Sequence, residues 1–171
     1  MEVDFNTQKE TTSAVATIKP IEEVNKNVVK IKFKKLHPDA TMPTYATNGS
    51  IGLDVRSVDC RYDSEIDAFI YHTGLAVELP EGYGLFPIPQ SRNRKTECYI
   101  PNTPGLVDTD YRGEIQLTYK TRDKFNRVQP YSVGDKCGQI VILPCPKVEF
   151  VEVEELSETD RGVNGHGSTG N

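Results

Sequence analysis

The sequence has no tryptophan, few cysteines, no long apolar run and no excess of positive charge. Its 171 residues include 25 acidic and 20 basic side chains, which gives a formal net charge of -5. Proteins that follow the phosphates of nucleic acids are usually basic. We therefore expect no general nucleic-acid binding, whereas a small anionic ligand held by a few local cations is still compatible with this charge. The length suits one domain with a real core.

The cysteines exclude a disulfide scaffold and a cysteine-rich metal site. They form no Cys-x-x-Cys pair, and none has metal-ligand spacing with a histidine. Buried, reduced thiols in an intracellular protein are the interpretation we favour. The four positions are Cys60, Cys98, Cys137 and Cys145.

Long apolar segments are also missing. The longest aliphatic run, Ile140 to Leu143, is far too short to span a bilayer. The N-terminus is acidic and lacks the apolar segment of a signal peptide. We predict no membrane association and a cytoplasmic location, or a nuclear one if the source is eukaryotic.

Helical periodicity is absent as well, and alternation with a period of two takes its place. Val29, Ile31 and Phe33 alternate with lysines, which is typical of a half-buried strand. In residues 52–58 the alternation places Asp54 on the face opposite Val55. Further strands are expected at residues 68–71, 74–79, 83–88, 115–119 and 140–143, the last one buried on both faces, and a bulge at 148–153. These features predict an all-β barrel or jelly roll of short strands.

Composition divides the chain into three parts. Residues 1–27 are polar and predict a flexible N-terminal extension. Residues 28–155 form the predicted β domain. Residues 156–171 carry four glycines and predict an arm that cannot hold a fixed shape unaided.

The central feature is the segment from Asn102 to Ile115. The polar residues 108–110 lie between two apolar runs, which predicts a hairpin turn. A stiff hairpin can present backbone N–H and C=O groups to a ligand. A carboxylate (Asp108), an aromatic ring (Tyr111) and a cation (Arg112) stand beside it. By itself the pattern also fits an ordinary surface hairpin.

Five motifs in order carry a resemblance to a known family. They occupy residues 52–56, 89–91, 102–114, 134–139 and 161–170. Together they resemble the homotrimeric dUTPase family, over Val28 to Asn171. The resemblance implies a dUTPase-like β-clip or jelly-roll barrel and hydrolysis of dUTP to dUMP and pyrophosphate with Mg²⁺. It also implies a homotrimer whose three active sites combine motifs of different chains.

The resemblance also implies roles for single residues. Asp108 would be the general base that activates water for in-line attack on the α-phosphorus. Asp54 would touch the water shell of a Mg²⁺ ion bound by the phosphates. Arg161 and the tail would close as a lid, with His166 over the base. The expected substrate-binding residues are Ser91, Arg92, Asn102, Gly105, Val107, Tyr111, Gln139, Arg161, His166, Gly167, Ser168 and Thr169.

Three positions depart from the family pattern. Gln90 stands where arginine is usual, Arg92 where a small residue is usual, and His166 where phenylalanine is usual. Gln90 removes a positive charge from a polyphosphate site, and Arg92 is a candidate to restore it.

Two other functions stay open from the sequence. A deaminase acting on dCTP shares this fold, but it needs a glutamate to activate water and has no use for the glycine-rich tail. The other open function is that of a regulatory or binding protein, in which a dUTPase-like domain has weakened catalysis. The intact Asp108, Tyr111 and Arg161 argue against this function.

Overall fold

Ten short strands and one 3₁₀ helix make up the structure, a computed structural model that describes residues 28–164. The chain divides into two units, Met1–Ile31 and Lys32–Asn171, and every strand belongs to the second unit. The predicted extension, residues 1–27, lies outside the described residues, so its state stays a prediction. Within the described range the one helix is the short η2 (Ser91–Lys95). The predicted all-β class is confirmed.

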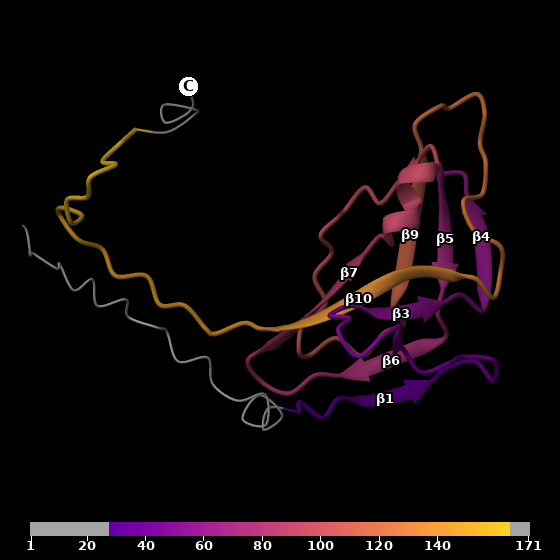
Figure 1. The fold of residues 1–171 in the computed structure, drawn as a ribbon, viewed down its shortest axis with the longest axis horizontal. Coiled ribbons are helices and arrows are strands. Elements are labelled where there is room, and N and C mark those ends of the chain that lie inside the picture. The colour runs from indigo at the N-terminus through magenta and orange to yellow at the C-terminus, as the bar shows by residue number, and fades with distance from the viewer. Residues whose placement is uncertain (1–27, 165–171) are drawn as a thin grey trace, which may run out of the picture. The chain divides into compact units, whose positions relative to one another are not determined.

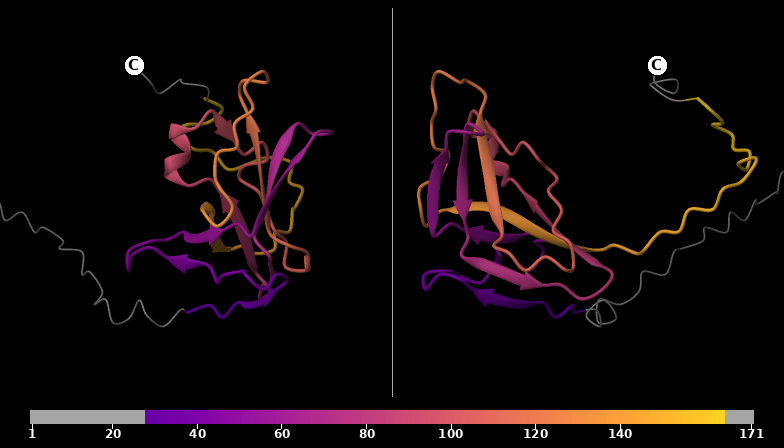
Figure 2. Two further views of the ribbon diagram at one scale, coloured as in Figure 1. Left: turned by 90° about the vertical axis from the view of Figure 1, so that its right-hand side faces the viewer. Right: turned by 180° about the vertical axis from the view of Figure 1, so that it is seen from behind.

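The strands form three antiparallel sheets (Figure 1). One sheet pairs β1 with β6, the second has the order β2-β3-β10-β7, and the third has the order β4-β5-β9-β8. In Figure 1, β4, β5 and β9 stand side by side while β3 and β10 run across them, and Figure 2 shows the same crossing from behind. The strand bounds are β1 Lys32–Lys35, β2 Thr44–Tyr45, β3 Leu53–Arg56, β4 Asp59–Asp63, β5 Ala68–His72, β6 Leu75–Glu78, β7 Tyr83–Ile88, β8 Cys98–Tyr99, β9 Gln116–Thr121 and β10 Lys136–Pro144.

Strands β9 and β10 join the two larger sheets. The hydroxyl of Tyr119 donates to the carbonyl of Cys137 at 2.7 Å. Next to it, a Cβ atom on Gly138 would lie only 2.2 Å from Leu117 Cδ2. Glycine at position 138 therefore lets the sheets approach closely, because any side chain there would push Leu117 out of the core.

Three tyrosines form the centre of the core. The rings of Tyr71, Tyr119 and Tyr131 meet edge to face, with centroids 5.4–5.9 Å apart. The Tyr71 hydroxyl donates to the Tyr131 carbonyl at 2.7 Å and accepts from the Tyr131 N–H at 2.9 Å. Buried tyrosines are stable where the hydroxyl has such partners. Burial raises the pKa of Tyr71 and of Tyr119, so both stay neutral hydroxyls.

Two strand predictions need correction. Ile140 is buried in β10, but Leu143 is 44% exposed, so the prediction that both faces of this strand are buried is wrong at its end. Asp54 lies on β3 between neighbours that are buried or half-buried, and it is itself 6% exposed. Alternation placed Asp54 opposite Val55, but it did not reveal that Gln139 on β10 and Gln90, the residue before η2, donate to the carboxylate.

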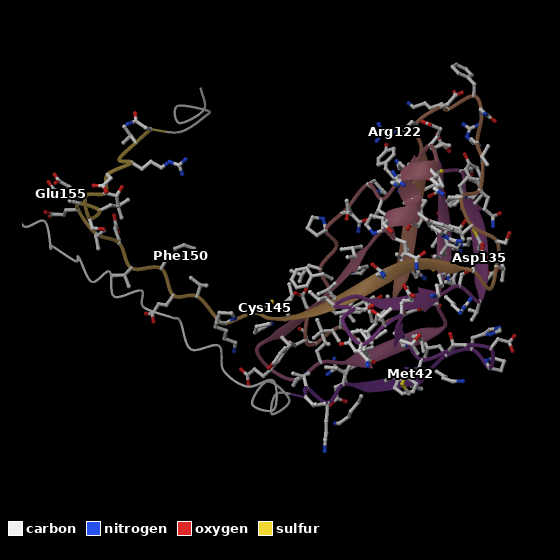
Figure 3. All side chains as sticks on the ribbon, in the orientation of Figure 1. Met42, Arg122, Asp135, Cys145, Phe150 and Glu155 are labelled. Carbon is white, nitrogen blue, oxygen red and sulfur yellow. The ribbon has the colours of Figure 1, made fainter. Side chains whose placement is uncertain are left out.

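After β10 the described chain continues without strand or helix from Cys145 to Asn164. The predicted bulge at residues 148–153 is therefore wrong, because this segment pairs with no strand among residues 28–164. Its apolar side chains are exposed, and Figure 3 labels Phe150, which is 95% exposed.

All four cysteines are unbonded thiols. Cys98 and Cys137 are buried, whereas Cys60 and Cys145 are partly exposed, so the prediction of buried thiols holds for the first two. Burial raises the pKa of the Cys137 thiol to about 12. In residues 28–164, no helix has the length and apolar character needed to cross a membrane.

Candidate functional site

The segment 102–115 lines a cleft of about 310 Å³. Its walls include five residues that the sequence predicted for substrate binding or catalysis: Asn102, Gly105, Val107, Asp108 and Tyr111. The predicted turn is confirmed, because the Tyr111 N–H donates to the Asp108 carbonyl at 3.3 Å. The local sequence thus brings a carboxylate, an aromatic ring and an amide to one small cleft.

The two arms of this segment pair with the body and not with each other. Val107 donates to the Leu85 carbonyl at 2.8 Å and accepts from the Leu85 N–H at 3.3 Å. On the other arm, the Ile115 N–H donates to the Leu75 carbonyl at 2.8 Å. The prediction of a hairpin with paired arms is therefore wrong. Each arm satisfies its backbone groups on a different strand, which fixes the segment between β7 and β6.

Tyr111 lies across Gly113. A Cβ atom on Gly113 would be 2.2 Å from the Tyr111 hydroxyl oxygen, and this hydroxyl donates to the Glu114 carbonyl at 3.1 Å. Tyr111 is 47% exposed and lines the cleft, so its ring is accessible to a ligand. Because residue 113 is glycine, the Tyr111 ring can occupy this position.

Arg112 stabilises the turn. Its Nη1 atom donates to the carbonyls of Thr109 at 2.6 Å and Tyr111 at 2.9 Å. Asp108 is in the opposite situation: it is exposed, and within residues 28–164 no donor pairs with its carboxylate. Its oxygens are therefore available to a water molecule or a ligand.

Glu114 connects the segment to the strands beside it, a role that sequence reasoning missed. It accepts from the Gly74 N–H at 2.7 Å and from Gln116 Nε2 at 3.0 Å, and it lies 2.7 Å from His72 Nδ1. Burial by itself raises the pKa of Glu114, but the hydrogen bonds from Gln116, His72 and Gly74 outweigh it and lower the pKa overall. Glu114 lies inside the third motif, but two of its three partners, His72 and Gly74, are about forty residues away, which a local pattern cannot indicate.

A second group of motif residues, which includes the predicted site residue Gln139, surrounds Asp54. Its Oδ1 atom accepts from Gln90 Nε2 at 2.8 Å and from Gln139 Nε2 at 3.0 Å. Its Oδ2 atom lies 2.6 Å from Lys136 Nζ. Burial raises the pKa of Asp54, but the donors from Lys136, Gln139 and Gln90 outweigh it, so the pKa is lowered. We call these four side chains the Asp54 cluster; it unites the first, second and fourth motifs.

Arg92 is engaged with the body of the protein. Its guanidinium lies 4.6 Å from the centroid of the Tyr131 ring. Its Nη2 atom donates to the Lys136 carbonyl at 2.9 Å and lies 3.5 Å from Asp135 Oδ2. Figure 3 labels Asp135, which precedes β10. Ser91, the first residue of η2 and the sequence neighbour of Arg92, is exposed.

The predicted site residues fall into separate groups within one chain. In the described range 28–164, no hydrogen bond or ion pair joins the segment 102–115 to the Asp54 cluster. Arg161 lies on the exposed segment after β10. Residues 166–169, which include His166, Gly167, Ser168 and Thr169, lie outside the described residues.

In the described part of the chain, few side chains that could bind a metal ion lie together. No group of three or more His, Cys, Asp or Glu side chains converges there as ligands for an ion.

Relatives of known name match most of the sequence. The profile of the dUTPase family matches residues 38–170. The deoxyuridine 5'-triphosphate nucleotidohydrolase of Hydrogenobaculum sp. (strain Y04AAS1) is 41% identical over 145 residues, covering 83% of this chain and 99% of that protein. The protein of the same name from Helicobacter pylori (strain ATCC 700392 / 26695) is 39% identical over 148 residues, covering 83% of this chain and 97% of its own.

Solved structures share the fold. The Staphylococcus bacteriophage 80alpha dUTPase with dUpNHpp superimposes with a TM-score of 0.69 at 24% identity, covering 83% of this chain and 99% of that chain. A mutant dUTPase from phage phi11 of S. aureus, described with a structural Mg(II) ion, has a TM-score of 0.60 at 22% identity and covers 74% and 97% of the two chains. The β-clip or jelly-roll architecture expected above is the fold of these proteins. Because its five motifs, its fold and its identity to named relatives agree along most of its length, the chain belongs to the dUTPase family.

Proposed function

We propose that this protein hydrolyses dUTP to dUMP and pyrophosphate. The observation that carries the proposal is the cleft at residues 102–115, where the exposed carboxylate of Asp108 and the accessible ring of Tyr111 line one small space. Family membership supports the same reaction, because the named relatives are deoxyuridine triphosphate nucleotidohydrolases.

Uracil fits the polar groups of the cleft. Its N3–H donor lies between two carbonyl acceptors, so it needs one acceptor and two donors from the protein. Gly105 lies beside the Asn102 amide, since a Cβ atom on Gly105 would be 3.7 Å from Asn102 Nδ2. The Val107 N–H is bound to the Leu85 carbonyl, and the Val107 carbonyl accepts from the Leu85 N–H. The second lone pair of that carbonyl is the contribution of Val107. Cytosine reverses the pattern at N3 and C4 and leaves buried polar groups unpaired, which discriminates strongly against it.

Asp108 is the proposed general base. A carboxylate without a protein donor can orient a water molecule and accept its proton during in-line attack on the α-phosphorus. Tyr111 packs against the deoxyribose in this proposal and leaves no space for a 2′-hydroxyl, so the ribonucleotide UTP is excluded.

The triphosphate lies against the second group of residues, with Ser91 and Gln139 as donors and with Arg92 a predicted contact. Asp54 fits an indirect contact with Mg²⁺. Its Oδ1 atom already accepts from Gln90 and Gln139, and its Oδ2 atom keeps one lone pair beside Lys136 for a metal-bound water. A bound Mg²⁺ ion would neutralise phosphate charge and keep the triphosphate in one conformation.

We further propose a homotrimer whose active sites lie between chains. The described lining of the cleft at residues 102–115 includes no member of the Asp54 cluster, which supports it, because a second copy can then bring the two groups of site residues together. The exposed apolar side chains after β10, among them Phe150 at 95% and Leu156 at 87% exposure, also favour contact with another copy. The arm with Arg161, His166, Gly167, Ser168 and Thr169 would close over the bound nucleotide and exclude water.

The test is pyrophosphate release from the four dNTPs, UTP and dUTP, with and without Mg²⁺. Of these nucleotides, we expect only dUTP to release pyrophosphate rapidly. Ammonia release from dCTP would indicate the related deaminase chemistry. Nucleotide binding without any turnover would indicate a binding or regulatory protein, and either result overturns the proposal.

A further inference from the structure

The Asp54 cluster has one positive charge, and it comes from Lys136. A polyphosphate site here needs a cation, and no other member of the cluster carries one. Gln90 and Gln139 are neutral amides, and Asp54 is an anion. Without Lys136 the cluster would carry a net negative charge and would repel a triphosphate.

Two neighbouring arginines, Arg92 and Arg56, are bound to other groups. Arg92 stacks on Tyr131 and donates to the Lys136 carbonyl. Arg56, which is next to the cluster on β3, donates through Nη1 to the Gly134 carbonyl at 2.9 Å. Either guanidinium would lose these contacts if it turned toward a ligand at Asp54.

The ammonium group of Lys136 has N–H donors without a protein partner in residues 28–164. An ammonium group has three N–H donors, and in residues 28–164 the single partner of Nζ is Asp54 Oδ2 at 2.6 Å. The Lys136 side chain is 39% exposed, whereas Asp54 is 6% exposed. The buried carboxylate thus holds the amine in place while two of its donors face solvent. The second N–H of each amide, on Gln90 and on Gln139, is available beside it.

We propose that Lys136 binds the β- or γ-phosphate of dUTP and takes over the charge that Gln90 does not carry. The amine keeps its contact with Asp54 and donates its remaining protons to phosphate oxygens, so no switch of partner is needed. Gln90 acts as a neutral support for Asp54. This inference rests on the proposed function and names a binding residue for that same site.

The test is nucleotide binding by calorimetry, with non-hydrolysable dUpNHpp and with dUMP, each in EDTA and in Mg²⁺. In Lys136→Met we expect dUpNHpp to bind about tenfold to a hundredfold more weakly, the range for a lost hydrogen bond to a charged group. Binding of dUMP, which lacks the outer phosphates, should change by less than about threefold. Lys32→Met, which removes an exposed lysine paired with Glu78, is the matched control and should change neither.

Two further variants separate phosphate binding from mere support of Asp54. Lys136→Gln keeps a donor for Asp54 but lacks the charge, and it should bind dUpNHpp as weakly as Lys136→Met; it also serves if the methionine variant does not fold. Adding Gln90→Arg to Lys136→Met should restore binding of dUpNHpp. In an Asp54→Asn background, Lys136→Met should still weaken dUpNHpp binding.

The outcomes are distinct. Equal weakening of dUMP and dUpNHpp, or no effect of Lys136→Met once Asp54 is Asn, would make Lys136 a support for Asp54 only and overturn the inference. A native protein that turns over dUTP while Lys136→Met binds dUpNHpp normally would overturn the inference and leave the function standing. A native protein that neither binds dUpNHpp nor hydrolyses dUTP would overturn both.

Discussion

Asp108 differs from the carboxylates around it in its partners. Asp54 and Glu114 each accept from three groups, and their pKa values are lowered. Asp108 is exposed in the cleft and has no donor within residues 28–164. A carboxylate that is fully hydrogen-bonded is a poor proton acceptor, whereas a free one can bind water and take its proton. This contrast separates the proposed general base from Asp54 and Glu114, which protein donors hold in place.

Replacing Asp108 by Asn should therefore affect turnover and leave binding intact. We expect kcat to fall by about two to four decades, the range for a lost general base, with dUpNHpp binding changed little. Steady-state kinetics together with calorimetry measure both. Asp110→Asn, two residues along the same turn, is the matched control, and an equal loss of kcat in both variants would remove Asp108 from its role.

Segment 102–115 is held by contacts at both of its arms and at its turn. Val107 bonds to β7, Ile115 to β6, and Glu114 to His72 and Gly74. Each contact is modest by itself, but together they leave the segment little freedom, as a binding loop on a rigid scaffold requires. Substitutions inside the segment should therefore change specificity as well as stability.

Gly113→Ala should displace Tyr111. The added methyl group would lie 2.2 Å from the Tyr111 hydroxyl oxygen, so the ring must move. Because Tyr111 is 47% exposed and its ring can move outward, we expect the unfolding free energy to fall by less than about 1 kcal/mol. The preference for dUTP over UTP, measured as the ratio of kcat/KM, should fall about tenfold. Gly49→Ala, where nothing lies within 4 Å of the new methyl group, should change neither quantity.

Glu114→Gln should make stability less dependent on pH. Burial raises the pKa of Glu114, but its hydrogen bonds hold the folded-state pKa below the ordinary value of 4.5. The ionised form therefore stabilises the fold above pH 4.5, and this stabilisation is lost as the pH falls through the folded-state pKa.

Denaturation at a series of pH values tests this prediction. Near neutral pH we expect Glu114→Gln to lose about 1–3 kcal/mol, the range for disrupting a hydrogen-bonded buried charge. The difference from the native protein should shrink in acid. Glu81→Gln, at an exposed pair with Lys147, should cost less than about 1 kcal/mol at any pH. A gap that persists unchanged in acid would contradict the role of the charge.

Under the proposed function, a single chain does not contain a complete active site. The cleft, the Asp54 cluster and the arm with Arg161 each hold part of the expected machinery, and no hydrogen bond or ion pair in the described range connects the first two. Exposed apolar side chains follow β10. Association of copies would bury this surface and bring the parts together.

Light scattering should therefore give three times the 19.1 kDa mass of the chain. Asp108→Asn and Arg161→Ala should each be inactive alone, because each breaks a different part of every site. Refolded together, they should recover activity, since some mixed sites then contain one intact copy of each motif. A fully active monomer, or a mixture as inactive as its parts, would overturn shared sites.

Local patterns in the sequence were sufficient for the all-β class, the turn at residues 108–110 and the five motifs that place the chain in its family. Alternation and turn chemistry depend on neighbours along the chain, so they can be read without a structure. The same patterns misjudged the hairpin arms and the end of β10, because the partners of those residues are far away in the sequence.

The contacts that give the site its chemistry are long-range. Asp54 meets Gln139, which is 85 residues away, and Glu114 meets His72, which is 42 residues away. Whether a carboxylate is free or covered, and which lysine neutralises it, depends on strand register and on how the sheets pack. A residue's type states which hydrogen bonds it can make, and only the folded chain determines which partners lie within 3 Å of it.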